Sequence, residues 1–324
     1  MNGRRRLVSV VVPVYFNASS LPAAAERFRQ LAKDLRDYRF EFLFVDDGSA
    51  DESWPELRRI VDELPGARAL RLARNFGSHM ATLAGYEACR GDLVVHVNAD
   101  LQEPPELIAR LLEAQERTGC DVVLAARESR PEGRANRLFA RLYYGAVRRW
   151  ILPAMPVGGT DCYLLTRKAL ATVLAAAEAN TSLPGLVLWS GHSLALVPYD
   201  REARHSGRSR WTLAKKIKLL VDTVVSFSYL PVRLMIVTGL LVGFASFGYA
   251  GWIIVRRLLL EITTPGWSSL MVVVLLLGGI QMIFLGLLGE YLWRTYEAAR
   301  SRPLYVVDEV YEAVRGEGDA SPPA

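Results

Sequence analysis

The sequence predicts an α/β domain built on a mostly parallel sheet, followed by a hairpin of two membrane-spanning helices. Short apolar runs alternate with amphipathic segments through the first part of the chain, and two long uncharged segments follow position 230. Strands that are apolar along their whole length, alternating with helices, are typical of parallel sheets covered on both faces. A length of 324 residues agrees with about two domains.

Five apolar runs are predicted as strands and the amphipathic segments between them as helices. The strands are expected at 7–14, 40–45, 67–72, 92–97 and 120–125, and the helices near 20–36, 52–64, 78–89 and 104–118. Pro104 and Pro105 stand at the start of the last helix, where a missing N–H costs little. The N-terminal apolar run is short and interrupted by Pro13, so it is predicted as a buried strand and not as a signal peptide. The globular domain is expected to occupy residues 1–212.

The segments 234–255 and 268–289 contain no charged residue. Each would be about 33 Å long as a helix, which is enough to cross a bilayer core of about 30 Å. The alternative is a pair of buried soluble helices, but soluble helices of this length usually show a polar stripe. We therefore expect an amphipathic juxtamembrane helix at 213–232 and two spans within 233–290. A C-terminal segment, 291–324, is expected to end in a disordered tail.

The charge distribution predicts the orientation in the membrane. The segment between the spans contains two basic residues, Arg256 and Arg257. Basic residues near the spans are more numerous on the side of the termini: Lys215, Lys216, Lys218, Arg233, Arg294, Arg300 and Arg302. The positive-inside rule then places the domain and both termini in the cytoplasm. The net charge of +5 suits an anionic partner such as phosphate or lipid. The three cysteines form no CxxC pair, which argues against a disulfide framework or a zinc site.

Two acidic residues follow the predicted strand at 40–45. Asp46 and Asp47 precede Gly48, which permits a sharp turn. Ligands of open α/β sheets bind outside the carboxyl ends of the strands, where such carboxylates can accept hydrogen bonds from a base or a ribose. The alternative is that Ser49 or Asp51 simply caps the following helix. Both interpretations stay open at this point.

Oxygen-bearing side chains alternate after the predicted strand at 92–97. They are Asn98, Asp100 and Gln102. Mg²⁺ and Mn²⁺ prefer oxygen ligands, and such an ion would bridge a diphosphate and stabilise its charge as it leaves. The alternative is a loop that only caps the helix at 104–118.

A third group of candidate residues is basic. Guanidinium groups match phosphate oxygens in a two-pronged geometry. The alternative is a charged surface facing solvent or lipid headgroups. The candidates are Arg127, Arg130, Arg134 and Arg137, and further along Arg204, Arg208 and Arg210.

With these motifs in this order, the chain resembles the glycosyltransferase family 2 enzymes of GT-A fold. More closely, it resembles the polyprenyl-phosphate glycosyltransferases of the dolichol-phosphate mannose synthase type, whose bacterial members transfer glucose or a modified arabinose to undecaprenyl phosphate. The resemblance covers about residues 7–310. It is carried by VVVPVYFN (10–17), FVDDGSADES (44–53), RNFGSHMATLAGYEACRGDLVV (74–95), NADLQEPPELI (98–108) and LLGEYLWRTYEAARSRPLYVV (287–307).

The resemblance implies an inverting, metal-dependent transfer from a nucleotide-sugar to undecaprenyl phosphate. It favours UDP-sugars over GDP-sugars and implies Mg²⁺ or Mn²⁺ as the cofactor. It also implies an enzyme of the cytoplasmic membrane, in contact with membrane lipids and assembled as a homo-oligomer.

The same resemblance implies roles for individual residues. Asp100 would be catalytic, together with Asp161, which stands in GGTDCYLLTR (158–167) where the family has an active-site aspartate. The metal would be held by Asp100 and Gln102. The nucleotide-sugar would be bound by Pro13, Tyr15, Asp46, Asp47, Asn98, Ala99 and Asp100. The acceptor and donor phosphates would be bound by Arg127, Arg130, Arg204, Ser209 and Arg210.

Two departures from the family pattern stand in the site itself. Asn98 replaces the first Asp of the family's DADLQ motif, so it offers a carbonyl oxygen without a charge. Ala18 stands where the family usually has an acid after VPVYN, which leaves the contacts to the base open.

Three other functions are weighed against this one. Asn98 favours an inactive scaffold or lipid-binding membrane protein, whereas Asp46, Asp100 and Gln102 speak against it. A processive polysaccharide synthase would carry a QxxRW motif, but Gly207 stands where Gln is needed, and two spans are few for a polymer channel. A nucleic-acid binder would interleave aromatic residues on a basic face, whereas here the basic residues cluster near the spans.

Overall fold

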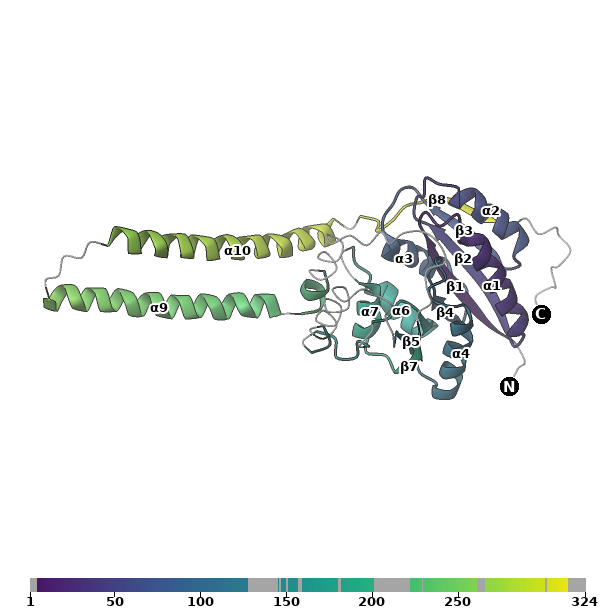
Figure 1. Ribbon diagram of the computed structural model, residues 1–324, viewed down its shortest axis with the longest axis horizontal. Coiled ribbons are helices and arrows are strands. Elements are labelled where there is room, and N and C mark those ends of the chain that lie inside the picture. Colours follow the sequence, from purple (N-terminus) through teal and green to yellow (C-terminus); the bar gives the residue numbers. More distant parts are fainter. Residues whose placement is uncertain are drawn as a thin grey trace. The chain divides into compact units, whose positions relative to one another are not determined.

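The computed structural model describes residues 5–127, 145, 147–149, 151–156, 159–179, 182–200, 222–228, 230–260, 266–300 and 302–313 (Figure 1). The chain forms two compact units. The first comprises Met1–Thr223 with Pro303–Ala324, and the second comprises Val224–Arg302.

The first unit contains an eight-stranded sheet with the strand order β7-β5-β6-β4-β1-β2-β3-β8. β6 and β8 are antiparallel to their neighbours, and the other pairings are parallel. The predicted mostly parallel sheet is therefore confirmed. The strands are β1 (Arg6–Val14), β2 (Tyr38–Asp46), β3 (Ala67–Leu72), β4 (Leu93–His96), β5 (Val122–Arg127), β6 (Tyr163–Thr166), β7 (Leu194–Tyr199) and β8 (Val307–Glu312).

Helices connect most of these strands and cover the sheet. The predicted strands and helices of residues 1–127 are present within a few residues of the expected bounds, whereas β6, β7, β8 and the two later helices of this unit were not predicted. The helices are α1 (Leu21–Asp34), α2 (Ser53–Glu63), α3 (Ser78–Ala88), α4 (Glu106–Thr118), α6 (Arg167–Ala175) and α7 (Leu183–Trp189).

The two faces of the central strands are buried against different helices. Phe28 of α1, Leu57 of α2 and Leu111 of α4 belong to one core cluster with Val10 and Val12 of β1. Their alternation along the strand places these two valines on one face of the sheet. Burial on both faces explains why the strands are apolar throughout.

The opposite face of β1 and β2 packs against α3 at a glycine. A Cβ atom on Gly85 would lie 2.3 Å from Cγ1 of Val11 and 3.2 Å from Cγ2 of Val45. No real Cβ approaches a methyl group so closely, so only glycine lets α3 lie this near to the sheet. Both faces of the sheet are thus covered, as the apolar strands predicted.

The chain returns to the first unit as an edge strand after the two long helices. β8 pairs antiparallel with β3, with Val310 opposite Leu70. Its residues also contact α2, because the Tyr311 hydroxyl donates to Asp62 at 3.0 Å. The sequence predicted no strand in the segment 291–324, and the pairing adds a distant part of the chain to the sheet.

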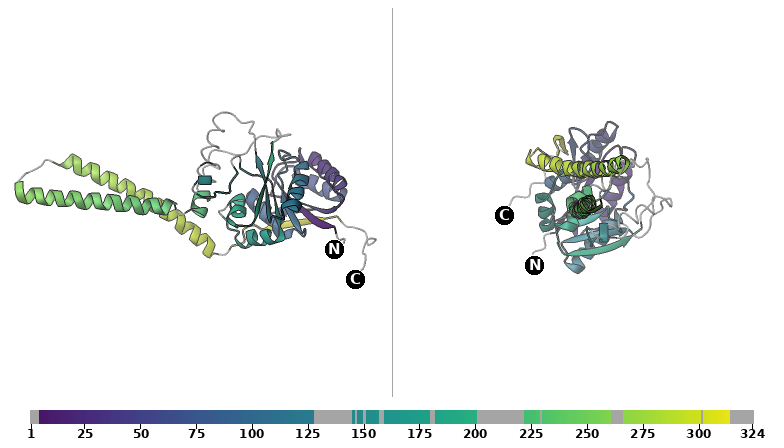
Figure 2. Two further views of the ribbon diagram at one scale, coloured as in Figure 1. Left: turned by 90° about the horizontal axis from the view of Figure 1, so that it is seen from below. Right: turned by 90° about the vertical axis from the view of Figure 1, so that its left-hand side faces the viewer.

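The second unit contains two long apolar helices, α9 (Leu230–Leu260) and α10 (Trp267–Ala299) (Figure 2). Leu230–Ile253 and Leu276–Ala299 have mean hydropathies of 1.8 and 1.4, so both helices are long and apolar enough to cross a membrane, by length and composition. Large apolar side chains such as Phe244 and Phe247 are exposed. The helices contain the predicted spans 234–255 and 268–289 and extend beyond them.

Candidate active site

The residues predicted to bind the nucleotide-sugar and the metal come from the carboxyl ends of β1, β2 and β4. β2 and β3 lie on one side of β1, and β4 lies on the other, so the strand order reverses between β1 and β4. Such a reversal opens a crevice at the carboxyl ends of the two strands, where ligands of α/β proteins bind. The loops that flank the reversal are in contact, because the Ser20 hydroxyl donates to the carbonyl oxygen of Ala99 at 3.0 Å.

The loops after β1 and β2 are joined by two serine side chains. The Phe16 N–H donates to Oγ of Ser49, and the Asn17 N–H donates to Oγ of Ser53, both at 3.0 Å. Phe16 itself has a φ of 55°, in the left-handed region that bulky residues rarely adopt. Tyr15 therefore lies in a turn that two serines hold, with its ring edge-to-face against Phe16 at 4.6 Å between centroids.

The capping alternative for Ser49 is wrong. The N-cap residue of α2 is Glu52, which makes no side-chain capping bond. Asp51 accepts a hydrogen bond from the Ser53 N–H at 3.2 Å, so it does support the start of the helix. Ser49 instead connects two strand-end loops.

Asp46 is fully buried at the end of β2. Its oxygens accept the Ser49 N–H at 3.2 and 3.3 Å, and Nε of Arg71 lies 3.6 Å from Oδ2. Burial raises the pKa of the Asp46 carboxyl, and the bonds from Ser49 and the charge of Arg71 oppose that rise. The carboxylate shapes its own turn, and its contact with a nucleotide stays a prediction.

Asp47 holds the segment before α3. One carboxylate oxygen accepts the Phe76 N–H at 2.7 Å and the other accepts the Gly77 N–H at 2.9 Å. Burial raises the pKa of Asp47 to about 6, against the lowering effect of these two bonds. Gly48 follows with a φ of +66°, and a Cβ there would lie 2.5 Å from the carbonyl carbon of Arg74. A nucleotide contact by Asp47 likewise stays a prediction.

Pro13 is buried in β1, opposite Val45 of β2. The pairing of β1 with β4 ends at Val11, so Pro13 lies beyond the part of the strand that is paired on both sides. A residue without an N–H is tolerated there. Its predicted place beside the nucleotide is not tested by this burial.

The loop after β4 contains the predicted metal ligands. Oδ1 of Asp100 accepts the Gln102 N–H at 3.2 Å. Leu101, between them, has a φ of 58° and a buried side chain. Asn98 donates from Nδ2 to Oε2 of Glu103 at 3.0 Å. Asp100 and Gln102 thus lie two positions apart in one turn. The hydrogen bond between Asn98 and Glu103 holds the backbone at both ends of this turn.

The oxygen donors of this turn fit a hard divalent cation. Asp100 supplies a carboxylate, and Gln102 can supply an amide oxygen. The described residues contain no group of three or more His, Cys, Asp or Glu side chains that could hold a metal ion. Mg²⁺ is commonly held by one or two carboxylates together with substrate phosphates and water, and this turn would supply one such carboxylate.

Asp161 and Arg127 meet at the same edge of the sheet. β6 runs antiparallel to β4 and β5, so the start of β6 lies beside the carboxyl ends of both. Arg127 ends β5, Asp161 precedes β6, and the Arg127 guanidinium pairs with the Asp161 carboxylate. The Arg127 side chain is 4% exposed and that of Asp161 is 35% exposed. The sequence named both residues but not their pairing.

The structure adds two polar residues that the sequence analysis did not single out. Glu103 is fully buried, and its Oε1 accepts the Tyr199 hydroxyl at 3.4 Å. Tyr199 pairs with Arg127 in the register of β7 and β5. Burial, with Glu103 nearby, raises the pKa of Tyr199 to about 12, while Arg127 opposes the rise. The only signal for Glu103 was its place directly after Gln102.

The predicted phosphate-binding residues other than Arg127 lie outside the described residues, so their positions stay predictions. They are Arg130, Arg134, Arg137, Arg204, Arg208, Ser209 and Arg210.

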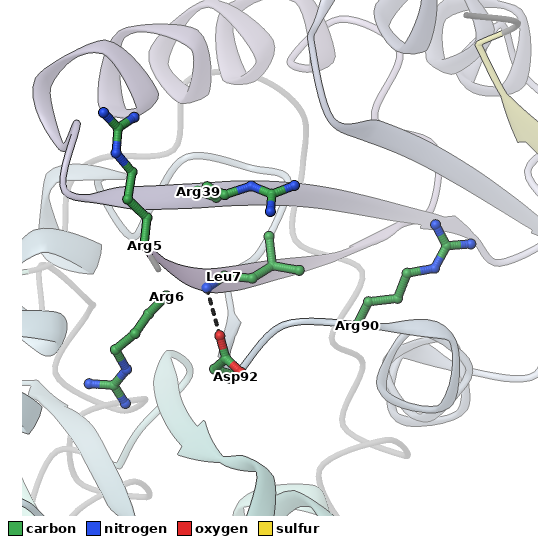
Figure 3. A pocket seen from close by; sticks show the side chains of 6 residues that line it. All are labelled: Arg5, Arg6, Leu7, Arg39, Arg90 and Asp92. Atoms are coloured by element: carbon green, nitrogen blue, oxygen red, sulfur yellow. Dashed lines mark hydrogen bonds between the residues drawn. The ribbon is translucent and has the colours of Figure 1, made fainter. Parts of the chain in front are cut away.

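A separate hollow of about 440 Å³ lies at the amino ends of β1 and β2 (Figure 3). The Leu7 N–H donates to Asp92 there at 2.8 Å. The guanidinium groups around it point in different directions in Figure 3 and do not converge on one point. The hollow is at the wrong end of the strands for the predicted chemistry. Its lining residues are Arg5, Arg6, Leu7, Arg39, Arg90 and Asp92.

The family model and the relatives that this chain matches all indicate a glycosyltransferase. Residues 9–174 match the model of glycosyl transferase family 2. An uncharacterized glycosyltransferase of Synechocystis sp. is 34% identical over 308 residues, which cover 94% of this chain and 95% of that protein. The prophage bactoprenol glucosyl transferase homolog of Escherichia coli is 32% identical over 94% of this chain and 99% of its own length.

Further matches extend the comparison to a phage protein and a solved structure. The bactoprenol glucosyl transferase of Shigella phage SfX is 33% identical over 93% of this chain and 98% of its own length. Mannosyl-3-phosphoglycerate synthase from Rubrobacter xylanophilus is 19% identical, with a TM-score of 0.49 over 72% of this chain and 75% of that chain. With its family model matched over residues 9–174 and its relatives matched over nearly the whole length, the chain belongs to glycosyltransferase family 2 and is a glycosyltransferase.

Proposed function

We propose that this enzyme transfers a sugar from a nucleotide-sugar, with UDP favoured over GDP, to undecaprenyl phosphate. The observation that carries the proposal is one chain that joins a strand-end glycosyltransferase site to two helices apolar enough to span a membrane. Relatives named bactoprenol glucosyl transferase match this whole arrangement over 93–94% of the chain and not the sheet domain alone.

The acceptor phosphate would act as the nucleophile without a strong general base. The second pKa of a phosphate monoester is about 6, so its oxygen is largely ionised near neutral pH. A single in-line displacement at the anomeric carbon forms the new sugar–phosphate bond, breaks the bond to the nucleoside diphosphate and inverts the carbon. The remaining task is to bring two anions together and to offset their repulsion.

Arg127 is proposed to offset part of that repulsion. Its guanidinium has five N–H donors, so it can keep its bond to Asp161 and still bind a phosphate oxygen. Asp161 would hold the guanidinium in one orientation, which is a role for the aspartate that its sequence position alone left open. Arg130, Arg204, Ser209 and Arg210 are proposed as further phosphate ligands by resemblance.

Asp100 and Gln102 would hold Mg²⁺ or Mn²⁺. When bound, such an ion offsets the negative charge that develops on the leaving diphosphate. The chain's own contribution is the turn itself, in which the Gln102 N–H orients the Asp100 carboxylate. Tyr15, Asp46 and Asp47 are proposed to border the nucleotide, together with Pro13, Asn98 and Ala99.

We further propose that α9 and α10 cross the cytoplasmic membrane with both termini in the cytoplasm. The polyprenyl tail stays in lipid, so the reaction has to occur at the membrane surface. Basic residues such as Arg233, Arg294 and Arg300, on the side of the termini, would face anionic headgroups there. The predicted homo-oligomer remains part of this proposal.

The test is turnover by the purified protein. It would be incubated with undecaprenyl phosphate, Mn²⁺ or Mg²⁺ and a panel of UDP- and GDP-sugars, and both diphosphate release and lipid-linked product would be followed. Asp100→Ala should make no product, whereas Asp37→Ala, an exposed residue in the turn before β2, should match the wild type. The loss in the first variant follows from removal of the only carboxylate of the proposed metal turn.

The outcomes separate the alternatives. A lipid-phosphate sugar made by the wild type and by Asp37→Ala, but not by Asp100→Ala, supports the proposal and identifies the donor. Nucleotide binding without turnover of any donor would support an inactive scaffold. Products that carry many sugars would support a processive synthase.

A further inference from the structure

The loop between β4 and α4 contains a hydrogen bond between a half-buried amide, that of Asn98, and a buried acid. Glu103 is fully buried, and its Oε2 accepts Nδ2 of Asn98 at 3.0 Å. Its Oε1 accepts the Tyr199 hydroxyl at 3.4 Å. A carboxylate removed from water needs such donors, because an unpaired buried charge costs several kcal/mol in general.

The pair brackets the turn that carries Asp100 and Gln102. Asn98 precedes this turn and Glu103 follows it, so their bond closes the loop across its base. Leu101 at the centre has a φ of 58°, a conformation that persists only when its surroundings hold it.

We propose that Asn98 is a positioning residue whose amide is matched to Glu103, and that this bond sets the shape of the Asp100–Gln102 turn. The inference rests on the proposed function of that turn as the metal site. It gives a reason for asparagine at a position where the family usually has aspartate. A carboxylate at position 98 would put an oxygen in place of the Nδ2 group that now donates to Glu103 at 3.0 Å. Two like charges at that separation repel each other, the more so because Glu103 is fully buried.

Glu103 also connects the turn to the opposite side of the site. Its second oxygen accepts from Tyr199, which is opposite Arg127 in the pairing of β7 and β5. Arg127 in turn pairs with Asp161. Arg127 also interacts with the Tyr199 hydroxyl, whose pKa it lowers, so Glu103, the acceptor of Asn98, is linked through Tyr199 to the proposed phosphate-binding arginine.

The test is an exchange of donor and acceptor between the two positions. Asn98→Asp removes the donor and places two carboxylates face to face. The double variant Asn98→Asp/Glu103→Gln restores one donor, because Nε2 of the new glutamine can donate to Asp while its Oε1 still accepts Tyr199. Glu103→Gln alone completes the cycle, since a cycle of single and double variants isolates the coupling of a contacting pair.

A matched control exists on α1. Nε2 of Gln30 donates to Oδ1 of Asp34 at 2.8 Å on an exposed helix face, so Gln30→Glu makes the same amide-to-acid change beside a carboxylate in water. It should leave turnover and melting temperature nearly unchanged, because solvent screens exposed charges.

Two readouts are needed, the melting temperature of the metal-free protein and kcat at saturating substrates. Asn98→Asp should melt several degrees lower than the wild type and lose about tenfold or more in kcat, and the double variant should recover most of both losses. The inference is overturned if Asn98→Asp equals the wild type, or if the double variant is no better than Asn98→Asp. Recovery of melting without recovery of kcat would reduce the pair to a structural contact and would also overturn the positioning role.

The melting cycle keeps this inference separate from the proposed reaction. It requires no donor or acceptor, so a wild type that turns over none of the sugars would contradict the proposed function while the melting coupling could still be present. A wild type that turns over, with no coupling in the cycle, would contradict the role of Asn98 and leave the reaction standing.

Discussion

The indole of Trp54 donates a hydrogen bond to Glu309, with 3.2 Å between Nε1 and Oε2, although the two residues are 255 positions apart in the chain. The bond joins α2 to β8, the strand that follows the two long helices. The guanidinium carbon of Arg71 lies over the Trp54 ring, 5.7 Å from the ring centroid. Nε of the same arginine is 3.6 Å from Oδ2 of Asp46. The C-terminal strand therefore contributes to the support of the loop after β2.

Glu309→Ala should lower the stability of the sheet domain. The substitution removes the acceptor of the Trp54 N–H, and loss of such a bond typically costs about 1 kcal/mol. Thermal unfolding of the purified protein would measure the shift. Asp308→Ala, on the same strand but exposed, is the control and should melt like the wild type. Equal shifts in the two variants would show that the Trp54 bond contributes nothing.

Gly48→Ala should be far more damaging than Gly119→Ala. Both glycines have a φ of +66°, so alanine is strained at either position. At Gly48 a Cβ would lie 2.5 Å from the Arg74 carbonyl carbon, whereas at Gly119 nothing lies within 4 Å. We expect a loss of about 1 kcal/mol at Gly119 and a clearly larger loss at Gly48, because main-chain atoms have to move.

Chemical or thermal unfolding of the two glycine variants gives the comparison, since they differ in surrounding space and not in φ. Similar losses would mean that the loop after β2 can move away from the segment at 74–75 at little cost. Turnover should also fall in Gly48→Ala and not in Gly119→Ala, because only the first residue lies beside the candidate site.

Asp47 should make stability fall as the pH rises between about 4 and 6. Folding raises its pKa from 3.8 to about 6, so the folded protein binds the proton more tightly than the unfolded chain does. The stability from this group is fully present below pH 4 and is lost as the pH passes through 6. A shift of this size corresponds to at most about 3 kcal/mol.

Asp47→Asn removes that titration and provides its test. The difference in melting temperature between Asp47→Asn and the wild type should shift in favour of the variant as the pH rises from 4.5 to 7.5. The changed bonds to Phe76 and Gly77 should lower the melting temperature of the variant by an amount that does not depend on pH. Gly119→Ala, which changes no titratable group, should show no such trend. A difference between Asp47→Asn and wild type that does not vary with pH would contradict the raised pKa.

Arg127→Lys should impair turnover although it keeps the positive charge. Lysine cannot hold Asp161 and a phosphate oxygen with the planar fork of a guanidinium, and the side chain is almost completely buried. We expect a loss of about tenfold or more in kcat/KM for the acceptor. Lys168→Ala breaks an exposed pair with Asp121 and should have little effect. Wild-type kinetics in Arg127→Lys would remove Arg127 from the proposed phosphate site.

Chelation should abolish turnover, and added Mn²⁺ or Mg²⁺ should restore it. The reason is that the proposed cation would offset the negative charge that develops on the leaving diphosphate, and chelation removes that cation. Initial rates after EDTA treatment and metal addition are the measurement. Full activity in EDTA would contradict the assignment of Asp100 and Gln102 as metal ligands.

Much of the framework was predictable because it depends on local composition. Strands such as β1 and β2 are apolar throughout since helices cover both of their faces, and that pattern is visible without knowledge of any partner. Asp46 and Asp100 could be placed at one edge of the sheet because the carboxyl ends of parallel strands meet there.

The sequence by itself thus determined the order of strands and helices in residues 5–127, the two long apolar helices and the strand-end positions of the site residues. Only the tertiary structure decided that Asp47 is bound to the amides of Phe76 and Gly77, that Arg127 pairs with Asp161, and that β8 completes the sheet. The physical reason is range. The periodicity and length of an apolar segment depend on residues that are close in the sequence, and they suffice to predict a strand or a helix. Buried acids and edge strands instead bind partners from distant segments, and the composition of either segment does not specify that partner.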